Sequence, residues 1–178
     1  MVKSKKAIFL DRDGVIVKQF TIKGKSYPPR NFKDFKIYPY VKERLFELKK
    51  NYLIFVITNQ PDVKKGLIEK KQLNQMHNLL INTLPIKNIY TCFHLREDFC
   101  KCRKPSPYFI LKAKKNFNIN LKNSYLIGDR ESDINAGNKV GCKTIFIDRN
   151  YSENKPQIYL KKFYSFNQAA KFIISESR

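Results

Sequence analysis

The sequence predicts an α/β fold in which helices cover both faces of a doubly wound parallel sheet. Short apolar runs, which indicate buried strands, alternate along the chain with segments whose apolar residues recur at helical spacing. Several of these runs are apolar throughout, as in strands that are covered on both faces. At 178 residues the chain is long enough for one domain with a substantial core, and we expect a single domain over residues 1–178.

The individual elements follow from these two patterns. Expected strands cover residues 7–10, 52–57, 86–93, 125–127 and 144–148. A helix is expected to begin near Pro39, and further helices cover residues 69–84, 107–117, 132–141 and 167–174. Ser132 is expected to cap the fourth helix and Gly141 to close it. Gly24 and the pair Pro28-Pro29 predict an ordered loop within residues 17–36, and the segment 149–162 receives no assignment.

The charge balance favours an anionic partner. The formal net charge is +21, with 36 Lys and Arg against 15 Asp and Glu. Such a field speeds encounters with sugar phosphates, nucleic acids or acidic lipids alike. The basic residues form no single block, so a nucleic-acid partner is possible but not favoured. No run approaches a membrane span, and residues 1–6 lead into too short an apolar run for a signal peptide, so a cytoplasmic location is expected.

Polar residues that suit phosphate and magnesium chemistry follow three of the apolar runs. Asp11 and Asp13 come directly after the first run, Thr58 after the second and Asp129 after the fourth. In doubly wound, Rossmann-like sheets, ligands bind beyond the carboxyl ends of the strands. Two close carboxylates favour a hard cation such as magnesium, and either could act as a nucleophile. Taken alone, each of these patterns also fits a solvated turn.

Three cysteines and a histidine predict a zinc site. Cys92, His94, Cys100 and Cys102 lie within eleven residues and form a usual ligand set for a four-coordinate structural zinc. A disulfide is disfavoured by the odd number of thiols and the intracellular context. Cys142 stands apart and is expected to be a small buried residue. His77, inside the expected helix over 69–84, is expected on its surface or flank.

These motifs together resemble the haloacid-dehalogenase superfamily. The resemblance rests on the run from Phe9 to Ile16, on Thr58-Asn59-Gln60, on the zinc ligands followed by Arg103-Lys104-Pro105, and on Gly128-Asp129 through Asp133. It extends over residues 6–148. Within the superfamily, the chain resembles the small zinc-containing branch of the D-glycero-D-manno-heptose 1,7-bisphosphate phosphatases and histidinol-phosphate phosphatases. Members of this branch lack a large cap domain.

The resemblance implies a role for each matching residue. Asp11 would be the nucleophile that forms an aspartyl-phosphate, and Asp13 would protonate the leaving oxygen and later activate water. Thr58 and Lys104 would hold the transferring phosphoryl group. The remaining implied residues are the magnesium ligands Asp11, Asp129 and Asp13, the last through its main-chain carbonyl, with Asp133 in support, and the substrate contacts Asn59, Arg103 and Arg130.

The chain also departs from the family pattern. Pro61-Asp62 follows Gln60, the loop over 24–30 is long, and Pro107-Tyr108 replaces Pro-Gly. Lys25 and Arg30 in that loop could contact a distal part of the substrate or simply be solvated. We therefore expect a monomeric, magnesium-dependent phosphatase with a structural zinc, acting on a sugar bisphosphate of the heptose type. The alternatives are a histidinol-phosphate phosphatase, a nucleic-acid end phosphatase and a non-catalytic zinc-stabilised binding module.

Overall fold

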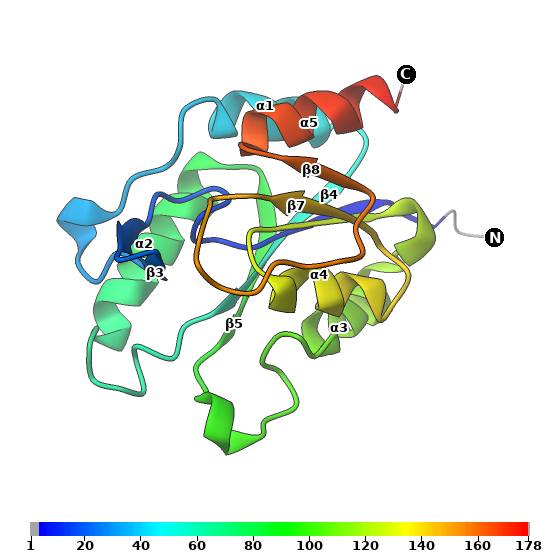
Figure 1. Ribbon diagram of the computed structural model, residues 1–178. Helices are drawn as coiled ribbons and strands as arrows, with labels where there is room; N and C mark the ends of the chain where they lie inside the picture. Colours follow the sequence, from blue (N-terminus) through cyan, green and yellow to red (C-terminus); the bar gives the residue numbers. More distant parts are fainter. Residues whose placement is uncertain (1–3, 178) are drawn as a thin grey trace.

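A computed structural model describes residues 4–177 (Figure 1). Residues 1–3, which open the charged N-terminal stretch, and residue 178 lie outside the described part. Within it, parallel pairing joins six strands into one sheet in the order β5-β4-β1-β6-β7-β8. In that order they span Ile86–Cys92, Leu53–Asn59, Ala7–Leu10, Tyr125–Gly128, Lys143–Ile147 and Lys161–Phe163. The predicted doubly wound parallel sheet is confirmed.

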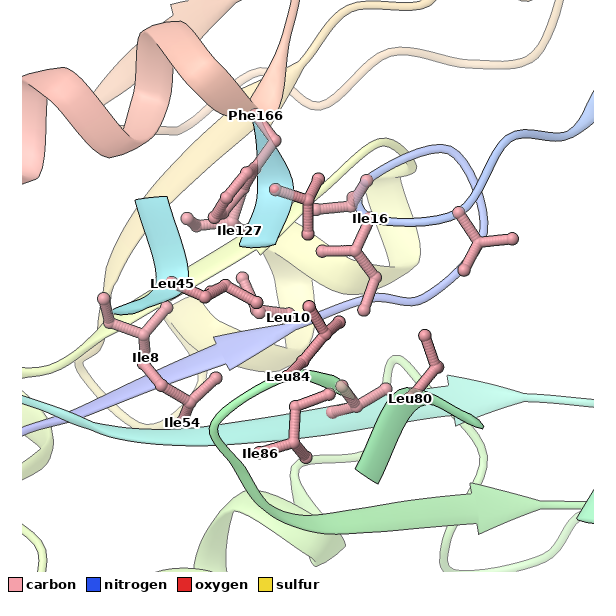
Figure 2. Close-up of a cluster of buried hydrophobic side chains, with 14 of the residues drawn as sticks. Ile8, Leu10, Ile16, Leu45, Ile54, Leu80, Leu84, Ile86, Ile127 and Phe166 are labelled. Carbon is pink, nitrogen blue, oxygen red and sulfur yellow. The ribbon is translucent and has the colours of Figure 1, made fainter. Parts of the chain in front are cut away.

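The helices cover both faces of this sheet. They span Val41–Leu48 (α1), Lys70–Thr83 (α2), Tyr108–Phe117 (α3), Glu131–Asn138 (α4) and Phe166–Ser175 (α5). Because side chains alternate along β1, Ile8 and Leu10 pack with α1, α2 and α5, whereas Ala7 and Phe9 pack with α3 and α4. Figure 2 shows the first of these two cores. No helix within residues 4–177 is both long and apolar enough to cross a bilayer.

The sheet topology places the end of β1 in a crevice. The chain starts in the middle of the sheet with β1, winds outward through β4 to β5, and then returns to β6 on the other side of β1. This reversal of direction leaves an opening beyond the carboxyl ends of β1 and β6, where ligands bind in sheets of this type. Asp11 and Asp129 follow these two strands directly.

Strands form in two segments for which the sequence predicted none. The expected loop over 17–36 contains an antiparallel hairpin of β2 (Phe20–Ile22) and β3 (Lys25–Tyr27), so it is not loop throughout. The unassigned segment 149–162 leads into β8, which pairs with β7. Short 3-10 turns at Phe32–Asp34, Arg96–Asp98 and Leu121–Asn123 connect other elements.

Helix α4 begins earlier than predicted. The sequence suggested Ser132 as its capping residue, but the cap is Arg130. The reason is that the Asp133 carboxylate accepts a hydrogen bond from the backbone N–H of Arg130 at 3.1 Å. A side chain at the third helical position thus reaches back to the residue that starts the helix, as in a capping box.

Candidate active site

A buried lysine joins three strand ends at the carboxyl edge of the sheet. Lys104 Nζ lies 2.6 Å from Asp11 Oδ1 and 2.8 Å from Asp133 Oδ1, and it donates to the backbone carbonyl of Ile57 at 2.7 Å. Asp11 follows β1, Ile57 lies in β4 and Asp133 lies in α4 after β6. The structure therefore brings Asp11, Lys104 and Asp133 together, although they come from distant parts of the sequence.

The charges in this cluster depend on one another. Burial disfavours the ammonium form of Lys104, but the carboxylates of Asp11 and Asp133 outweigh that effect and hold its pKa above the ordinary value. Burial raises the pKa of Asp133, and Lys104 opposes this rise. One ammonium faces two carboxylates, so the cluster has room for a further positive charge.

The loop that carries Lys104 is fixed by an amide side chain. Asn59, at the end of β4, accepts a hydrogen bond from the backbone N–H of Lys104 at 3.1 Å and donates to its carbonyl at 3.3 Å. These paired bonds hold the backbone of Lys104 against the strand. Asn59 was predicted as a substrate contact, and it also lines the cleft in front of the cluster.

Asp13 is buried in a different hydrogen-bond network. Its carboxylate accepts from Arg12 Nη2 at 2.9 Å and from Gln60 Nε2 at 2.7 Å. Gln60 also donates to Thr58 Oγ1 at 2.8 Å, which links the first and second motifs. Burial raises the pKa of Asp13, Arg12 opposes the rise and the nearby Asp11 charge adds to it. A raised pKa favours the protonated form of a carboxyl group, which is the form that can donate a proton.

One oxygen of Asp129 is saturated and the other is not. Asp129 Oδ2 accepts hydrogen bonds from Gln19 Nε2 at 2.8 Å and from the Tyr151 hydroxyl at 2.9 Å. No donor among the described residues reaches Oδ1, although that atom is buried. Burial, followed by the charges of Asp11 and Asp133, raises the pKa of Asp129 well above its usual range. Burial and the Asp129 charge likewise raise the pKa of Tyr151, which keeps its hydroxyl protonated.

A divalent cation fits this arrangement. Carboxylate oxygens of Asp11, Asp129 and Asp133 all lie within 4.8 Å of one another. A buried carboxylate oxygen without a donor is costly unless something positive satisfies it. Three hard oxygen donors of this kind suit magnesium. The Asp13 side chain is turned to Arg12 and Gln60, so any contribution of Asp13 to the cation would come from its main chain.

Gly14 allows the turn after β1 to approach Asp129 closely. Its φ is 80°, a conformation that residues with a Cβ rarely adopt. A Cβ built at Gly14 would overlap Asp129 Oδ2 and crowd Gln19 Nε2. Glycine is therefore required both by the backbone conformation and by the space around Asp129.

The cysteine and histidine ligands predicted for zinc converge in the structure. Cys92 Sγ lies 3.2 Å from Cys102 Sγ and 3.6 Å from Cys100 Sγ, and His94 Nδ1 lies 3.4 Å from Cys102 Sγ. A tetrahedral zinc with its usual bonds to sulfur separates two ligand sulfurs by about 3.8 Å. The donor set and its spacing fit a closed structural zinc. Cys142 is buried away from this group, as predicted.

A cleft of about 850 Å³ opens in front of Asp11, Thr58 and Lys104. Further basic side chains that line it belong to Arg30, Lys65, Arg96, Arg103 and Arg130. Arg30, which was considered as a contact for a distal part of the substrate, donates from Nε to Asp62 Oδ2 at 2.9 Å. Asp62, a departure from the family pattern, therefore holds Arg30 in place. Arg103 Nη1 donates to the carbonyl of His94 at 3.0 Å, which ties it to the cysteine and histidine cluster.

Four residues in these networks were not predicted from the sequence. Gln19 and Tyr151 contact Asp129, and Arg12 and His77 form a buried pair beside Asp13. The prediction that His77 lies on the surface or flank of its helix is wrong. A signal existed for Arg12, since an arginine between two carboxylates has to pair with one of them when it is buried. No comparable signal marks Tyr151 in the sequence.

Comparisons with known proteins extend these observations. A family model described as HAD-hydrolase-like matches residues 101–160. The D-glycero-alpha-D-manno-heptose-1,7-bisphosphate 7-phosphatase of Campylobacter jejuni is 32% identical over 176 residues, which span 94% of this chain and 95% of that protein. The histidine biosynthesis bifunctional protein HisB of Blochmanniella floridana is 32% identical over 151 residues, which span 79% of this chain and 40% of that protein.

A solved structure shares the fold over almost the whole chain. It is the crystal structure of a D,D-heptose 1,7-bisphosphate phosphatase from B. bronchiseptica, and it matches with a TM-score of 0.82 at 21% identity, covering 96% of this chain and 99% of that one. Likeness of this extent, in sequence and in fold, defines a phosphatase built on a parallel α/β sheet. More particularly, the chain belongs to the haloacid-dehalogenase-like family, which confirms the resemblance that the motifs predicted.

Proposed function

We propose that this phosphatase is magnesium-dependent, works through an aspartyl-phosphate on Asp11, and removes one phosphate from a D-glycero-D-manno-heptose 1,7-bisphosphate. The observation that carries the proposal is the 2.6 Å contact between Lys104 Nζ and Asp11 Oδ1 at the carboxyl edge of the sheet. A carboxylate held beside a fixed positive charge can attack a phosphoryl group whose oxygens that charge neutralises. We expect the enzyme to act as a cytoplasmic monomer.

In the first half of the reaction a carboxylate oxygen of Asp11 attacks phosphorus. The bond between phosphorus and the ester oxygen breaks, and Asp13 gives its proton to the leaving oxygen. The raised pKa of Asp13 supports this role, because burial favours its protonated form. Lys104 and the Thr58 hydroxyl hold the phosphoryl oxygens during the transfer.

In the second half the deprotonated Asp13 takes a proton from water. The water oxygen attacks phosphorus, the bond from phosphorus to Asp11 breaks, and inorganic phosphate leaves. Arg12 and Gln60 support this step, because their hydrogen bonds stabilise the charged form of Asp13 between the two halves.

The residues for magnesium are Asp11, Asp129 and the main-chain carbonyl of Asp13, with Asp133 in support. Magnesium, when bound, supplies positive charge to the phosphoryl oxygens and to the crowded carboxylates. The buried, unpaired Oδ1 of Asp129 supports this assignment. Asp133 bonds Lys104 and the backbone of Arg130, which suits a residue that orients the cluster.

We assign a structural role to zinc. Four protein ligands, Cys92, His94, Cys100 and Cys102, leave no open position for water. The loop that they close continues directly into Arg103 and Lys104. A zinc there would fix the start of the segment that brings Lys104 to Asp11.

The substrate assignment rests on the cleft and on the relatives. A sugar bisphosphate carries a second phosphate, and the basic residues of the cleft, including Arg103 and Arg130, suit such a group. Asn59, at the end of β4, lines the same cleft. The likeness to a heptose-1,7-bisphosphate 7-phosphatase over nearly the whole chain favours the heptose substrate. The likeness to HisB favours histidinol phosphate as the second candidate.

The test is phosphate release from a panel of esters with and without magnesium. The panel contains both anomers of the heptose bisphosphate, histidinol phosphate and a 5′-phosphorylated oligonucleotide, and Asp11→Asn is the matched inactive variant. We expect the highest kcat/KM with a heptose bisphosphate and a loss of at least about a thousandfold in Asp11→Asn. Release that needs no magnesium, or equal release from Asp11→Asn, would refute the mechanism. Preference for histidinol phosphate or the oligonucleotide would replace the heptose assignment.

A further inference from the structure

Tyr151 reaches the active site from a segment to which the sequence assigned no structure. Its hydroxyl donates to Asp129 Oδ2 at 2.9 Å and also contacts Gln19 Nε2, which donates to the same oxygen at 2.8 Å. Tyr151 is buried although the neighbouring residues 152–155 are exposed. One carboxylate oxygen of Asp129 therefore has two donors, one from each of two segments far apart in the chain.

Hydrogen bonds to two backbone carbonyls hold this segment across the mouth of the sheet. Arg149 Nε donates to the carbonyl of Gly14 at 2.7 Å, and the backbone N–H of Ser152 donates to the carbonyl of Gly24 at 3.0 Å. The first contact reaches the turn after β1 and the second reaches the turn between β2 and β3. Tyr151 lies between these two anchors, so its position is set by a hydrogen bond of the segment on either side of it.

The two donors leave the carboxylate asymmetric. Tyr151 and Gln19 both donate to Oδ2. These two hydrogen bonds fix the rotation of the Asp129 carboxylate about its Cβ–Cγ bond. Oδ1 stays buried and without a donor from residues 4–177. A carboxylate that binds a cation gains affinity when its other oxygen is held in this way, and removal of such a partner typically weakens binding about 10-fold to 100-fold.

We propose that Tyr151, with Gln19, is a positioning residue for the catalytic cation: the two donors occupy Asp129 Oδ2 and keep Oδ1 free and correctly oriented to bind magnesium. The inference rests on the proposed function, because it concerns the same cation. It goes further by giving the segment 149–155 a part in the site. Tyr151 acts only through Asp129 and touches no substrate in this scheme.

The variant that tests the proposal is Tyr151→Phe, which removes the hydroxyl and keeps the ring. Tyr164→Phe is the matched control, because Tyr164 is 58% exposed and its hydroxyl takes no part in the Asp129 network. Gln19→Met is the second test variant and removes the other donor at similar volume. Calorimetric titration of magnesium into the substrate-free proteins gives the Kd directly, and the melting temperature without magnesium reports any general loss of stability.

We expect the magnesium Kd to rise about tenfold or more in Tyr151→Phe and to rise in Gln19→Met, while Tyr164→Phe matches the unsubstituted protein. In kinetics the magnesium concentration for half-maximal rate should rise, and kcat should recover at saturating magnesium. An unchanged Kd in Tyr151→Phe, in a protein that does bind magnesium and hydrolyse phosphate esters, would overturn this role and leave the proposed function intact. Absence of magnesium binding in the unsubstituted protein would instead overturn the proposed function and this role with it.

Discussion

Arg12 Nη1 lies 3.1 Å from His77 Nε2, and both side chains are buried. The same guanidinium donates to Asp13 from Nε and Nη2, and its centre lies 5.5 Å from the centroid of the Phe35 ring. Since an arginine has no acceptor, His77 must present an unprotonated Nε2 to it. A neutral histidine from α2 thus completes the support behind the carboxyl group that we assign as acid and base.

This pair predicts a pH dependence of stability. Burial, followed by the charge of Arg12, lowers the pKa of His77 from 6.5 to about 3. Between pH 6.5 and about pH 3, His77 binds a proton in the unfolded chain but not in the folded protein. The contribution of neutral His77 to the free energy of unfolding is therefore complete above pH 6.5 and is lost as the pH falls. Relative to His77→Gln, whose amide oxygen can still accept from Arg12, the unsubstituted protein should lose roughly 2 kcal/mol more between pH 7 and pH 5. Urea unfolding of both proteins at pH 7 and pH 5 measures the free energy of unfolding. Equal losses of this free energy in the two proteins would contradict the prediction.

Substitutions at Gly14 and Gly141 allow the effect of backbone strain to be separated from the effect of steric overlap with Asp129. Their φ values are 80° and 74°, but a Cβ at Gly14 would overlap Asp129, whereas none of the described atoms lies within 4 Å of one at Gly141. Gly141→Ala should cost about 1–2 kcal/mol through backbone strain alone and leave hydrolysis unchanged. Gly14→Ala should cost more and reduce magnesium-dependent hydrolysis at least about tenfold. Equal losses of activity in the two variants would show that the close approach to Asp129 is unimportant.

The sequence predicted the sheet and the rim of the site because both rest on simple patterns. Each main strand is an apolar run, and polar side chains at strand ends must meet at one edge of a parallel sheet. The contact between Lys104 and Asp11 spans 93 positions of sequence, yet the family motifs anticipated it. Local chemistry at strand ends, together with topology, therefore located Asp11, Thr58 and Asp129.

The unpredicted features depend on tertiary contacts that leave no local pattern. All three residues of β2 are exposed, and their alternation of apolar and polar side chains, Phe20-Thr21-Ile22, is too short to distinguish a strand from a loop. His77 follows Leu73 by four positions and shares its buried helical face, but a histidine beside an apolar stripe gives no sign of its partner Arg12. Tyr151 meets Gln19 across 132 positions, and only the folded sheet brings them together.

Loss of one cysteine ligand should release the metal that we assign to the loop. Cys102→Ser is expected to lower bound zinc from about one per chain to near zero and to lower the melting temperature, because a closed zinc site contributes directly to folding. The matched control is Cys142→Ala, which alters a buried thiol outside the cluster and should keep its zinc. Metal analysis by mass spectrometry and thermal unfolding measure both. Zinc content that is unchanged in Cys102→Ser would refute the ligand set.

Lys104 should be essential for both activity and stability. In Lys104→Met the carboxylates of Asp11 and Asp133 lose their common partner, which in a buried ion-pair cluster typically costs about 3–5 kcal/mol, and kcat should fall at least about a hundredfold. The cost should shrink as the pH is lowered, because Asp133, whose pKa is raised by burial, then becomes neutral. Lys139→Met is the control: this exposed lysine donates to the carbonyl of Pro105 in the same loop, and its loss should change stability by less than about 0.5 kcal/mol. Near-normal turnover in Lys104→Met would mean that the ammonium beside Asp11 orders the carboxylates without taking part in phosphoryl transfer.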